Sequence, residues 1–339
     1  MSETAQKRIP VKRWIILFLI GLGGYLAFGV GGILKPVSPA VVLPGEPVWH
    51  GVNILPALPF LGILAPLPLT NTLLATFVAD IVLLVIALGV WRFTARGNLV
   101  PQGFYNFVEL LIEFLWNTTE STAGRWAKRM FPIMATIFLL VLTANLIKLI
   151  PGFESIGYLE EAHGSIPGYA VRPLIGETVS TIDGSAPMEE GGYTVVPFLR
   201  GSATDLNFTF ALALIAVFMI QVFGIWALRG SYFTKFFNLR TLFTVPFFGA
   251  IDFGVGLLEL VSEFSKILSF GFRLFGNILA GVLLVSILGA LTVVVLPAGL
   301  YIFEVLVAAI QAYIFAMLSL VFMSQATVGH HGDEHTEAH

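Results

Sequence analysis

The stretch AIDFGVGLLELVSEFSKILSFGFRLFGNILAGV, residues 250–282, is apolar enough to lie in a bilayer, yet it carries several ionisable residues. At about 100° per residue, these residues and one asparagine fall within one stripe of a helix. They are Asp252, Glu259, Glu263, Lys266, Arg273 and Asn277. A charged side chain at the bilayer centre costs roughly 2.5–3.5 kcal/mol on insertion scales, so the stripe must face protein or water. We interpret it as an ion path or a proton relay; the alternative is a set of ion pairs that only join helices.

The composition is that of an integral membrane protein. Of the 339 residues, 57% are hydrophobic and only 12% are charged, whereas soluble domains carry about 25% charged residues. Several runs reach the ~20 apolar residues that a helix needs to cross the hydrocarbon core, and the alternating segments of a transmembrane barrel are not found. The chain has no cysteine, which excludes disulfides and cysteine metal sites. We expect an all-α, polytopic helical bundle with about five to six transmembrane helices.

The chain divides into four segments. Basic residues followed by a long apolar run favour a retained membrane helix in residues 1–34 over a cleaved signal peptide. Residues 35–68 are a Pro-rich connection, predicted to be extracytoplasmic, and residues 69–325 are the membrane domain. The tail 326–339 is polar and rich in histidine; it could bind a metal, but a solvated tail is the favoured interpretation.

Within the membrane domain, apolar runs predict spans at residues 69–91, 131–150, 205–228 and 297–323. The first run contains Asp80 at mid-depth and the second contains Asn145. Residues 101–124 have one polar and one apolar face, which predicts a helix in the membrane interface or against a partner. Residues 152–203 are predicted to form an acidic, Gly- and Pro-rich extracytoplasmic loop.

Two further expectations concern orientation and helix length. Lys and Arg concentrate in the N-terminus and in residues 92–129 and 229–240, which predicts a cytoplasmic side for these segments and for the C-terminus. Residues 242–295 would reach about 80 Å as one straight helix, against a hydrocarbon core of about 30 Å. This run must therefore lie steeply tilted or fold into a hairpin.

Motifs in the last two apolar regions indicate a family. FGFRLFGNILAG, residues 270–281, and AAIQAYIFAMLSLVF, residues 308–322, resemble the signature of subunit a of the F-type ATP synthase. Weaker matches occur in the same order: PQGFYNFVELLIEFLW, ANLIKLIPGF and TDLNFTFALAL. The resemblance covers residues 69–325. It implies a helical bundle in which two long, strongly tilted helices pack against a ring of c subunits.

The resemblance also implies a function and partners. Members of the family are non-catalytic stator subunits that pass protons to and from c-ring carboxylates, so that ion flow is coupled to rotation and ATP synthesis. The implied partners are the c ring, the peripheral stalk b subunits, the rest of the ATP synthase and membrane lipid, with no nucleic acid. No cofactor or metal is expected, and we find no phosphate-binding loop for a nucleotide. The implied location is the bacterial inner (plasma) membrane.

Site residues follow from matching the motifs. Arg273 is similar to the family's essential arginine, which separates two offset half-channels, and an arginine stays protonated even when buried. The expected proton path contains Glu259, Ser262, Glu263, Asn277, Glu304 and Gln311. We expect Gln311 to hydrogen-bond the guanidinium or the ring carboxylate. Four residues are possible further members: Asp80, Asn145, Asp252 and Lys266, the last of which we expect to pair locally.

One departure from the family pattern affects the proton inlet. Val282 stands where many members carry Glu or His as the partner of the group at Glu304. Proton or sodium specificity stays open, because the ion's ligands lie mostly on the ring. Two other function classes remain. One is a secondary transporter or channel with an intramembrane Arg/Glu relay, which should show paired internal repeats with interrupted helices. The other is a purely structural membrane scaffold, which would not need so many ionisable groups in its last two apolar regions.

Overall fold

The computed structural model describes most of the chain and divides it into two compact units. The described residues are 44–49, 53–55, 67–95, 103–150, 152–162, 168–175, 179–188, 191–236, 246–291 and 295–328. The larger unit contains Leu43–Phe153, Leu199–Ile278 and Val307–His339, and the smaller one contains Met1–Val42, Glu154–Phe198 and Leu279–Leu306. The predicted helix in residues 1–34 and the tail beyond Val328 lie outside the described residues.

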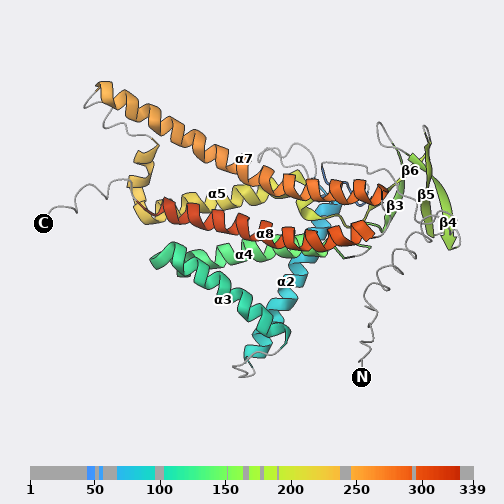
Figure 1. Ribbon diagram of the computed structural model, residues 1–339. Coiled ribbons are helices and arrows are strands. Elements are labelled where there is room, and N and C mark those ends of the chain that lie inside the picture. Colours follow the sequence, from blue (N-terminus) through green and yellow to red (C-terminus); the bar gives the residue numbers. More distant parts are fainter. Residues whose placement is uncertain are drawn as a thin grey trace, which may run out of the picture. The chain divides into compact units, whose positions relative to one another are not determined.

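Long helices make up most of the described chain (Figure 1). Their bounds are α2 Asn71–Ala95, α3 Phe104–Ala123, α4 Ala127–Ile147, α5 Leu206–Leu228, α7 Pro246–Leu291 and α8 Val295–Ala326. Within the described residues, five helical segments are long and apolar enough to cross a membrane. They are Asn71–Ala95, Phe104–Ile147, Leu206–Tyr232, Phe253–Leu288 and Gly299–Ala326. The predicted all-α, polytopic membrane fold is confirmed.

The amphipathic segment and the span that follows it form two helices. The short 3-10 helix η2, Gly124–Trp126, joins α3 to α4. Gly124 has a φ of 47°, in the left-handed region that glycine adopts without a steric penalty, and it ends α3. One side of α3 buries Leu115, while Phe107 and Leu110 on another side are exposed. The exposed apolar side fits the predicted contact with the membrane interface or with a partner, and that choice stays a prediction.

The core of the larger unit lies among α4, α5, α7 and α8, with the end of α3 beside it. Fully buried side chains of this core include Met134 on α4, Leu274 on α7 and Phe315 on α8. Phe270 joins α7 to α8, because its ring centroid lies 5.1 Å from Phe315 and 5.9 Å from Phe322. Close-packed aromatic rings of this kind fix the rotation of one helix against the next.

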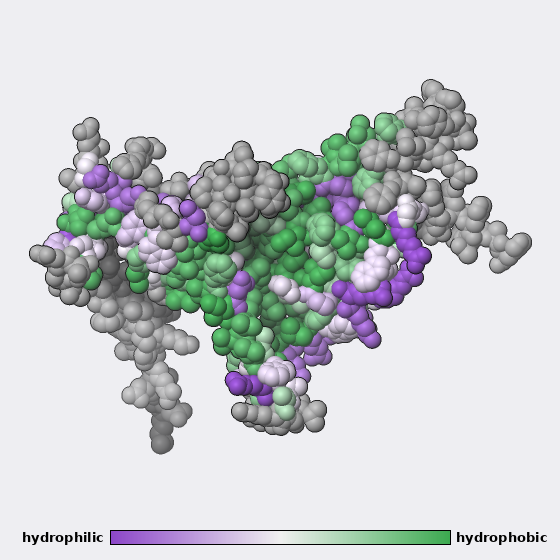
Figure 2. Space-filling view, turned by 180° about the vertical axis from the view of Figure 1, so that it is seen from behind, coloured by the Kyte–Doolittle hydropathy of each residue, from purple (hydrophilic) through white to green (hydrophobic). Residues whose placement is uncertain are grey.

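The first turn of α2 is hydrogen-bonded to the start of α5. Thr72 Oγ1 donates to Asp205 Oδ2 at 2.7 Å, and the other oxygen of Asp205 caps α5 by accepting from the Asn207 N–H at 2.8 Å. The rest of α2 exposes large apolar side chains, namely Phe77, Ile81, Leu84, Val85, Leu88 and Trp91. Figure 2 shows hydrophobic residues over much of the visible helical surface. Such continuous exposed apolar surface is expected where helices face lipid or other subunits.

α7 is one continuous helix of 46 residues. At 1.5 Å per residue it is about 69 Å long, more than twice the ~30 Å of a hydrocarbon core. The hairpin alternative for residues 242–295 is therefore wrong over Pro246–Leu291, and the steep tilt stays a prediction. Its part up to Ile278 belongs to the larger unit, and the remainder belongs to the smaller one.

The smaller unit contains a four-stranded antiparallel sheet where the sequence predicted only a loop at residues 152–203. Its strands are β3 Gly157–Glu161, β4 Gly168–Ile175, β5 Val179–Met188 and β6 Tyr193–Pro197, in the order β3-β6-β4-β5. β4 and β5 form a hairpin with irregular register, and Pro173 lies at one irregularity, where its missing N–H is tolerated. A second, two-stranded pair in the larger unit joins β1 Asn53–Leu55 to β2 Leu67–Pro68.

Candidate functional site

Arg273 lies on α7 in the larger unit, three residues after the buried Phe270. Its Nη2 donates a hydrogen bond of 3.4 Å to the hydroxyl of Ser269. Among the described residues, the guanidinium makes no ion pair. A guanidinium is always protonated in proteins. α7 therefore presents at this point a fixed positive charge whose counter-ion the described part of the chain does not supply.

Two amide side chains accompany the arginine. Asn277 lies four residues after Arg273, on the same face of the helix, and its Nδ2 donates to Gln311 Oε1 on α8 at 2.6 Å. Gln311 is only 2% exposed, and its Nε2 has no hydrogen-bond partner. The expected bond from Gln311 to the guanidinium is absent among the described residues, since Asn277 holds the glutamine oxygen. We call Ser269, Arg273, Asn277 and Gln311 the arginine group.

A second polar group lies nearer the start of α7. Glu263 is buried, and its Oε1 accepts from Lys266 Nζ at 2.7 Å, as the expected local pairing of this lysine requires. Its Oε2 accepts from Gln221 Nε2 on α5 at 2.9 Å, and Gln221 Oε1 accepts from the hydroxyl of Tyr232 at 2.6 Å. The ammonium of Lys266 also lies 4.9 Å from the centroid of the Phe322 ring. We call Tyr232, Gln221, Glu263 and Lys266 the Glu263 cluster.

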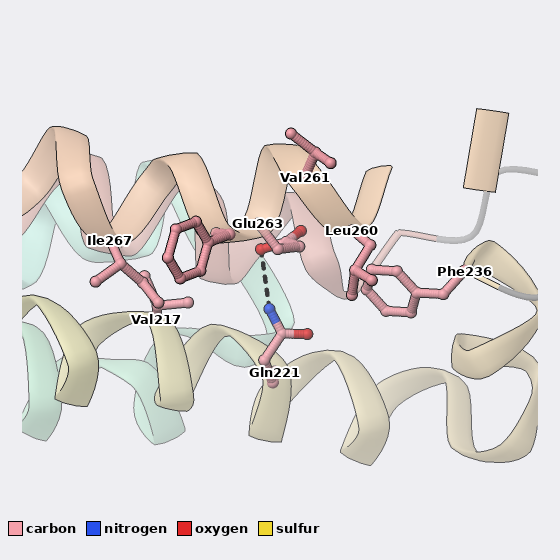
Figure 3. Close-up of a pocket in the computed structure, with 8 residues that line it drawn as sticks. Val217, Gln221, Phe236, Leu260, Val261, Glu263 and Ile267 are labelled. Carbon is pink, nitrogen blue, oxygen red and sulfur yellow. Dashed lines mark hydrogen bonds between the residues drawn. The ribbon is translucent and has the colours of Figure 1, made fainter. Parts of the chain in front are cut away.

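An open groove with mostly apolar walls borders the Glu263 cluster (Figure 3). Its volume is about 670 Å³, and it lies between α5 and α7. Figure 3 shows Glu263 and Gln221 joined across it, with apolar side chains around them. Val217, Leu260, Phe264 and Ile267 belong to its walls. Since these walls offer no further polar group, the partners of Glu263 within the groove come from the cluster itself.

The remaining predicted residues at the start of α7 are not brought into the cluster. Glu259 is partly buried and lies one turn before Glu263, while Ser262 is exposed. The side chain of Asp252 lies outside the described residues. Glu259 is about 21 Å from Arg273 along the helix axis, at 1.5 Å per residue. Together Glu259 and Ser262 form the more accessible polar surface of this half of α7.

Glu304 belongs to the smaller unit, where it lies against a glycine of α7. A Cβ atom placed on Gly281 would be 2.5 Å from Glu304 Oε1, so the carboxylate occupies space that any other residue would fill. Val282, which stands where the family pattern has a polar partner, is half-buried beside this glycine. The structure thus places a glycine, rather than a second acid, against Glu304.

Asn145 and Asp80 are placed very differently. Asn145 on α4 is fully buried, and neither its Nδ2 nor its Oδ1 has a hydrogen-bond partner. An unsatisfied buried amide costs roughly 1–3 kcal/mol, so such a group indicates bound water or a functional role. Asp80 on α2 is exposed and makes no hydrogen bond or ion pair within the described residues.

Sequence reasoning missed two residues of the Glu263 cluster. Gln221 is the one amide in α5 after Asn207 in its first turn, and that isolation within an apolar run is the signal that could have found it. Tyr232 follows α5 in the 3-10 helix η4, Arg229–Lys235, and its ring lies directly against Gly224, where a side chain would clash. No group of three metal-ligating side chains occurs in the described part of the chain.

Comparison with known proteins gives one consistent result. A family model described as ATP synthase A chain matches residues 73–324. The chain is 35% identical over 235 residues to ATP synthase subunit a of Pseudoalteromonas atlantica, covering 68% of this chain and 78% of that protein. It is 25% identical over 267 residues to ATP synthase subunit a of Moorella thermoacetica, covering 79% and 95%. It is also 27% identical over 265 residues to the sodium ion specific ATP synthase subunit a of Propionigenium modestum, covering 77% and 75%.

Proposed function

The chain belongs to the ATP synthase A chain family, and we propose that it carries protons through two offset half-channels that Arg273 keeps apart. It is a multi-pass membrane protein whose partners are the other ATP synthase subunits, and its role is ion translocation by the stator. The finer assignment is that protons pass to and from carboxylates on a c ring, so that their flow drives rotation and ATP synthesis. No observation favours a secondary transporter.

The observation that carries the proposal is the charge of Arg273, which has no counter-ion among the described residues. A nearby cation lowers the pKa of a carboxylic acid, so a ring carboxyl that reaches Arg273 gives up its proton before it passes. Arginine suits this position because it does not release its own proton, as a lysine in a dry site can. The unpartnered Gln311 Nε2 supplies a second donor for the same carboxylate.

The outlet path is best assigned to Glu259 and Ser262. Both lie on the side of α7 that the Glu263 cluster leaves accessible. Glu263 itself is held by Lys266 and Gln221, so that it joins α5 to α7. We therefore propose that Glu263 anchors this path and that Glu259 relays protons along it. The contribution of Asp252 to the same path stays a prediction.

The inlet path is assigned to Glu304 and to buried amides. Position 282, where the family pattern has a polar group, is a valine here, and we propose that water and amide side chains take part in the relay. Asn145 supports this, because a buried amide without protein partners is a typical ligand for an internal water. Asn277, Gln311 and Asp80 are proposed as further members.

Orientation is proposed from charge. Arg125, Lys128, Arg129 and Arg229 gather where α4 begins and α5 ends, and basic residues favour the cytoplasmic side of a membrane. We therefore place this end, and the C-terminus, in the cytoplasm of a bacterium, with the protein in the plasma membrane. The exposed apolar faces of α2 and α3 are candidate contacts for the peripheral stalk b subunits.

The test is acid-driven ATP synthesis by the assembled complex in vesicles. We expect Arg273→Ala to lower synthesis below detection, with a passive proton leak, while the complex still assembles. Arg92→Ala, at an exposed arginine of α2, is the matched control and should retain normal synthesis. Normal synthesis in the Arg273 variant would refute the proposal. Repeating the measurement with sodium ions alone distinguishes a sodium path from a proton path.

A further inference from the structure

Arg129 is stacked on two tryptophans where α4 begins and α5 ends. Its guanidinium carbon lies 5.2 Å from the centroid of the Trp126 ring and 4.5 Å from that of Trp226. The two indoles meet edge to face at 5.9 Å, and Phe223 stacks on Trp226 at 6.0 Å. Such stacking occupies the flat faces of a guanidinium and leaves its N–H edges open.

The donors at this place are not matched by acceptors. Arg129 makes no hydrogen bond or ion pair within the described residues. The indole N–H of Trp126 is buried and also lacks an acceptor. Three more cations, Arg125, Lys128 and Arg229, are exposed at the same helix ends. Together these groups form an electropositive surface that favours binding of an anion.

The helix lengths place this cluster at the level of lipid headgroups. α4 has 21 residues, which at 1.5 Å per residue span about 31 Å, close to the thickness of a hydrocarbon core. Arg129 lies in its first turn, and Trp226 lies two residues before the end of α5. Tryptophan and basic residues concentrate at this depth in membrane proteins.

An apolar track on α5 leads to the cluster. Ile215, Phe218 and Ile225 are exposed, and their spacing of three and seven residues places them along one side of the helix. This side ends at Trp226, which is 53% exposed. A lipid whose head reached Arg129 would have this surface for its acyl chains. A protein carboxylate or a free anion has no need of such a track.

We propose that Arg129, with Trp126 and Trp226, binds the phosphate of an anionic phospholipid. The guanidinium edge offers paired donors that match two phosphate oxygens, and the Trp126 N–H offers another. Net negative lipid is selected because Arg125, Lys128 and Arg229 repel the quaternary ammonium of phosphatidylcholine. The site contains no residue of the proposed proton path, so failure of one proposal does not refute the other.

The experiment is native mass spectrometry of the detergent-purified complex after incubation with equal amounts of phosphatidylglycerol and phosphatidylcholine. We expect the chain released from the complex to retain phosphatidylglycerol in preference to phosphatidylcholine. Arg129→Gln should lower this retention about tenfold, the value of one charge-assisted contact. Retention by Arg129→Lys should lie between that of the unchanged chain and that of Arg129→Gln, since lysine keeps the charge but lacks the planar guanidinium that stacks on the indoles. Arg92→Gln, which removes an exposed arginine at the end of α2, should behave like the unchanged chain.

Four outcomes would overturn the proposal. Equal retention of the two lipids would remove the selectivity, and unchanged retention in Arg129→Gln would remove the site. Displacement of bound phosphatidylglycerol by inorganic phosphate alone would indicate a free-anion site. Loss of another subunit from the Arg129→Gln complex, with lipid retention unchanged, would instead assign the arginine to a protein carboxylate.

Discussion

The two polar groups on α7 differ in how their charged side chains are paired. In the Glu263 cluster, the carboxylate accepts from Lys266 at 2.7 Å and from Gln221 at 2.9 Å, and Tyr232 holds Gln221 from its other side. In the arginine group, Arg273 has a single long hydrogen bond to Ser269 and no ion pair among the described residues. Ten residues, or about 15 Å of helix, separate Glu263 from Arg273.

The comparison distinguishes charges that are paired within the chain and stabilise its fold, as in the Glu263 cluster, from a charge such as Arg273 that we propose is paired by another subunit. A charge that is paired inside one chain joins the elements that carry it, here α5 and α7. A charge without a counter-ion costs free energy in the isolated chain, and that cost is recovered only when another subunit brings the opposite charge. Each of the following substitutions acts on one group and spares the other.

The largest difference in ATP synthesis is expected between the variants Arg273→Lys and Lys266→Arg. Arg273→Lys should lower acid-driven ATP synthesis at least about a hundredfold, because lysine loses its charge more readily and cannot hold a carboxylate with two parallel bonds. Lys266→Arg should retain synthesis within about twofold, since it keeps the charge that the ion pair needs. Both variants are measured in vesicles. Comparable losses in the two would show that the groups do not differ in function.

Neutralising the two acids of this half of α7 should separate transport from stability. Glu259→Gln should slow proton uptake about a hundredfold, the range expected on loss of a proton-transferring group. Glu263→Gln should leave uptake within about twofold and lower stability by about 1.5–3 kcal/mol, the value of a charged hydrogen bond. Acid-driven uptake in vesicles and thermal unfolding of the solubilised complex measure the two effects. The reverse pattern would make Glu263 the relay.

The smallest effect is expected at the outer end of the Glu263 cluster. Tyr232→Phe removes the 2.6 Å bond to Gln221 Oε1 and should lower stability by about 1 kcal/mol while proton uptake stays unchanged. Tyr105→Phe is the control, because the Tyr105 hydroxyl makes no hydrogen bond within the described residues. Thermal unfolding of the complex compares the two. An equal shift in both variants would assign the Tyr232 effect to its ring.

Much of this arrangement was predictable from local patterns. The spans, the long apolar run that forms α7, and the pairing of Lys266 with a nearby glutamate follow from composition and helical spacing, whereas the choice of one continuous helix over a hairpin does not. The choice of Glu263 over Glu259 does not follow, since both lie on one stripe and the rotation of α5 decides which one meets Gln221. The contact of Gln311 with Asn277 rather than with Arg273 does not follow either, because the register of α8 on α7 decides between them, and the alternative contact with a ring carboxylate stays a prediction.

The sheet was missed for a different reason. Residues 157–197 are rich in Gly, Pro and acids, which ordinarily indicate turns. Strand pairing overrides these residues, since Gly157 lies opposite Pro197 at the end of the β3–β6 pair, and Pro173 lies at an irregularity of β4. Pairing between segments far apart in sequence leaves no periodic signal in either one, so reading each segment alone cannot detect it.

The length of α7 has a mechanical consequence. A stator subunit must resist the sideways pull of the ring that turns against it, and a helix about 69 Å long bends easily unless it is clamped. α7 is clamped at Phe270, against Phe315 and Phe322, and again at Glu263, against Gln221. Arg273, where the load would be applied, lies about 4.5 Å beyond the first clamp and about 15 Å beyond the second. Beyond Arg273, the Asn277–Gln311 bond ties α7 to α8 again. Under the proposed function, these contacts keep the arginine in place against the ring, so that the work of each passing charge goes into rotation rather than into bending the helix.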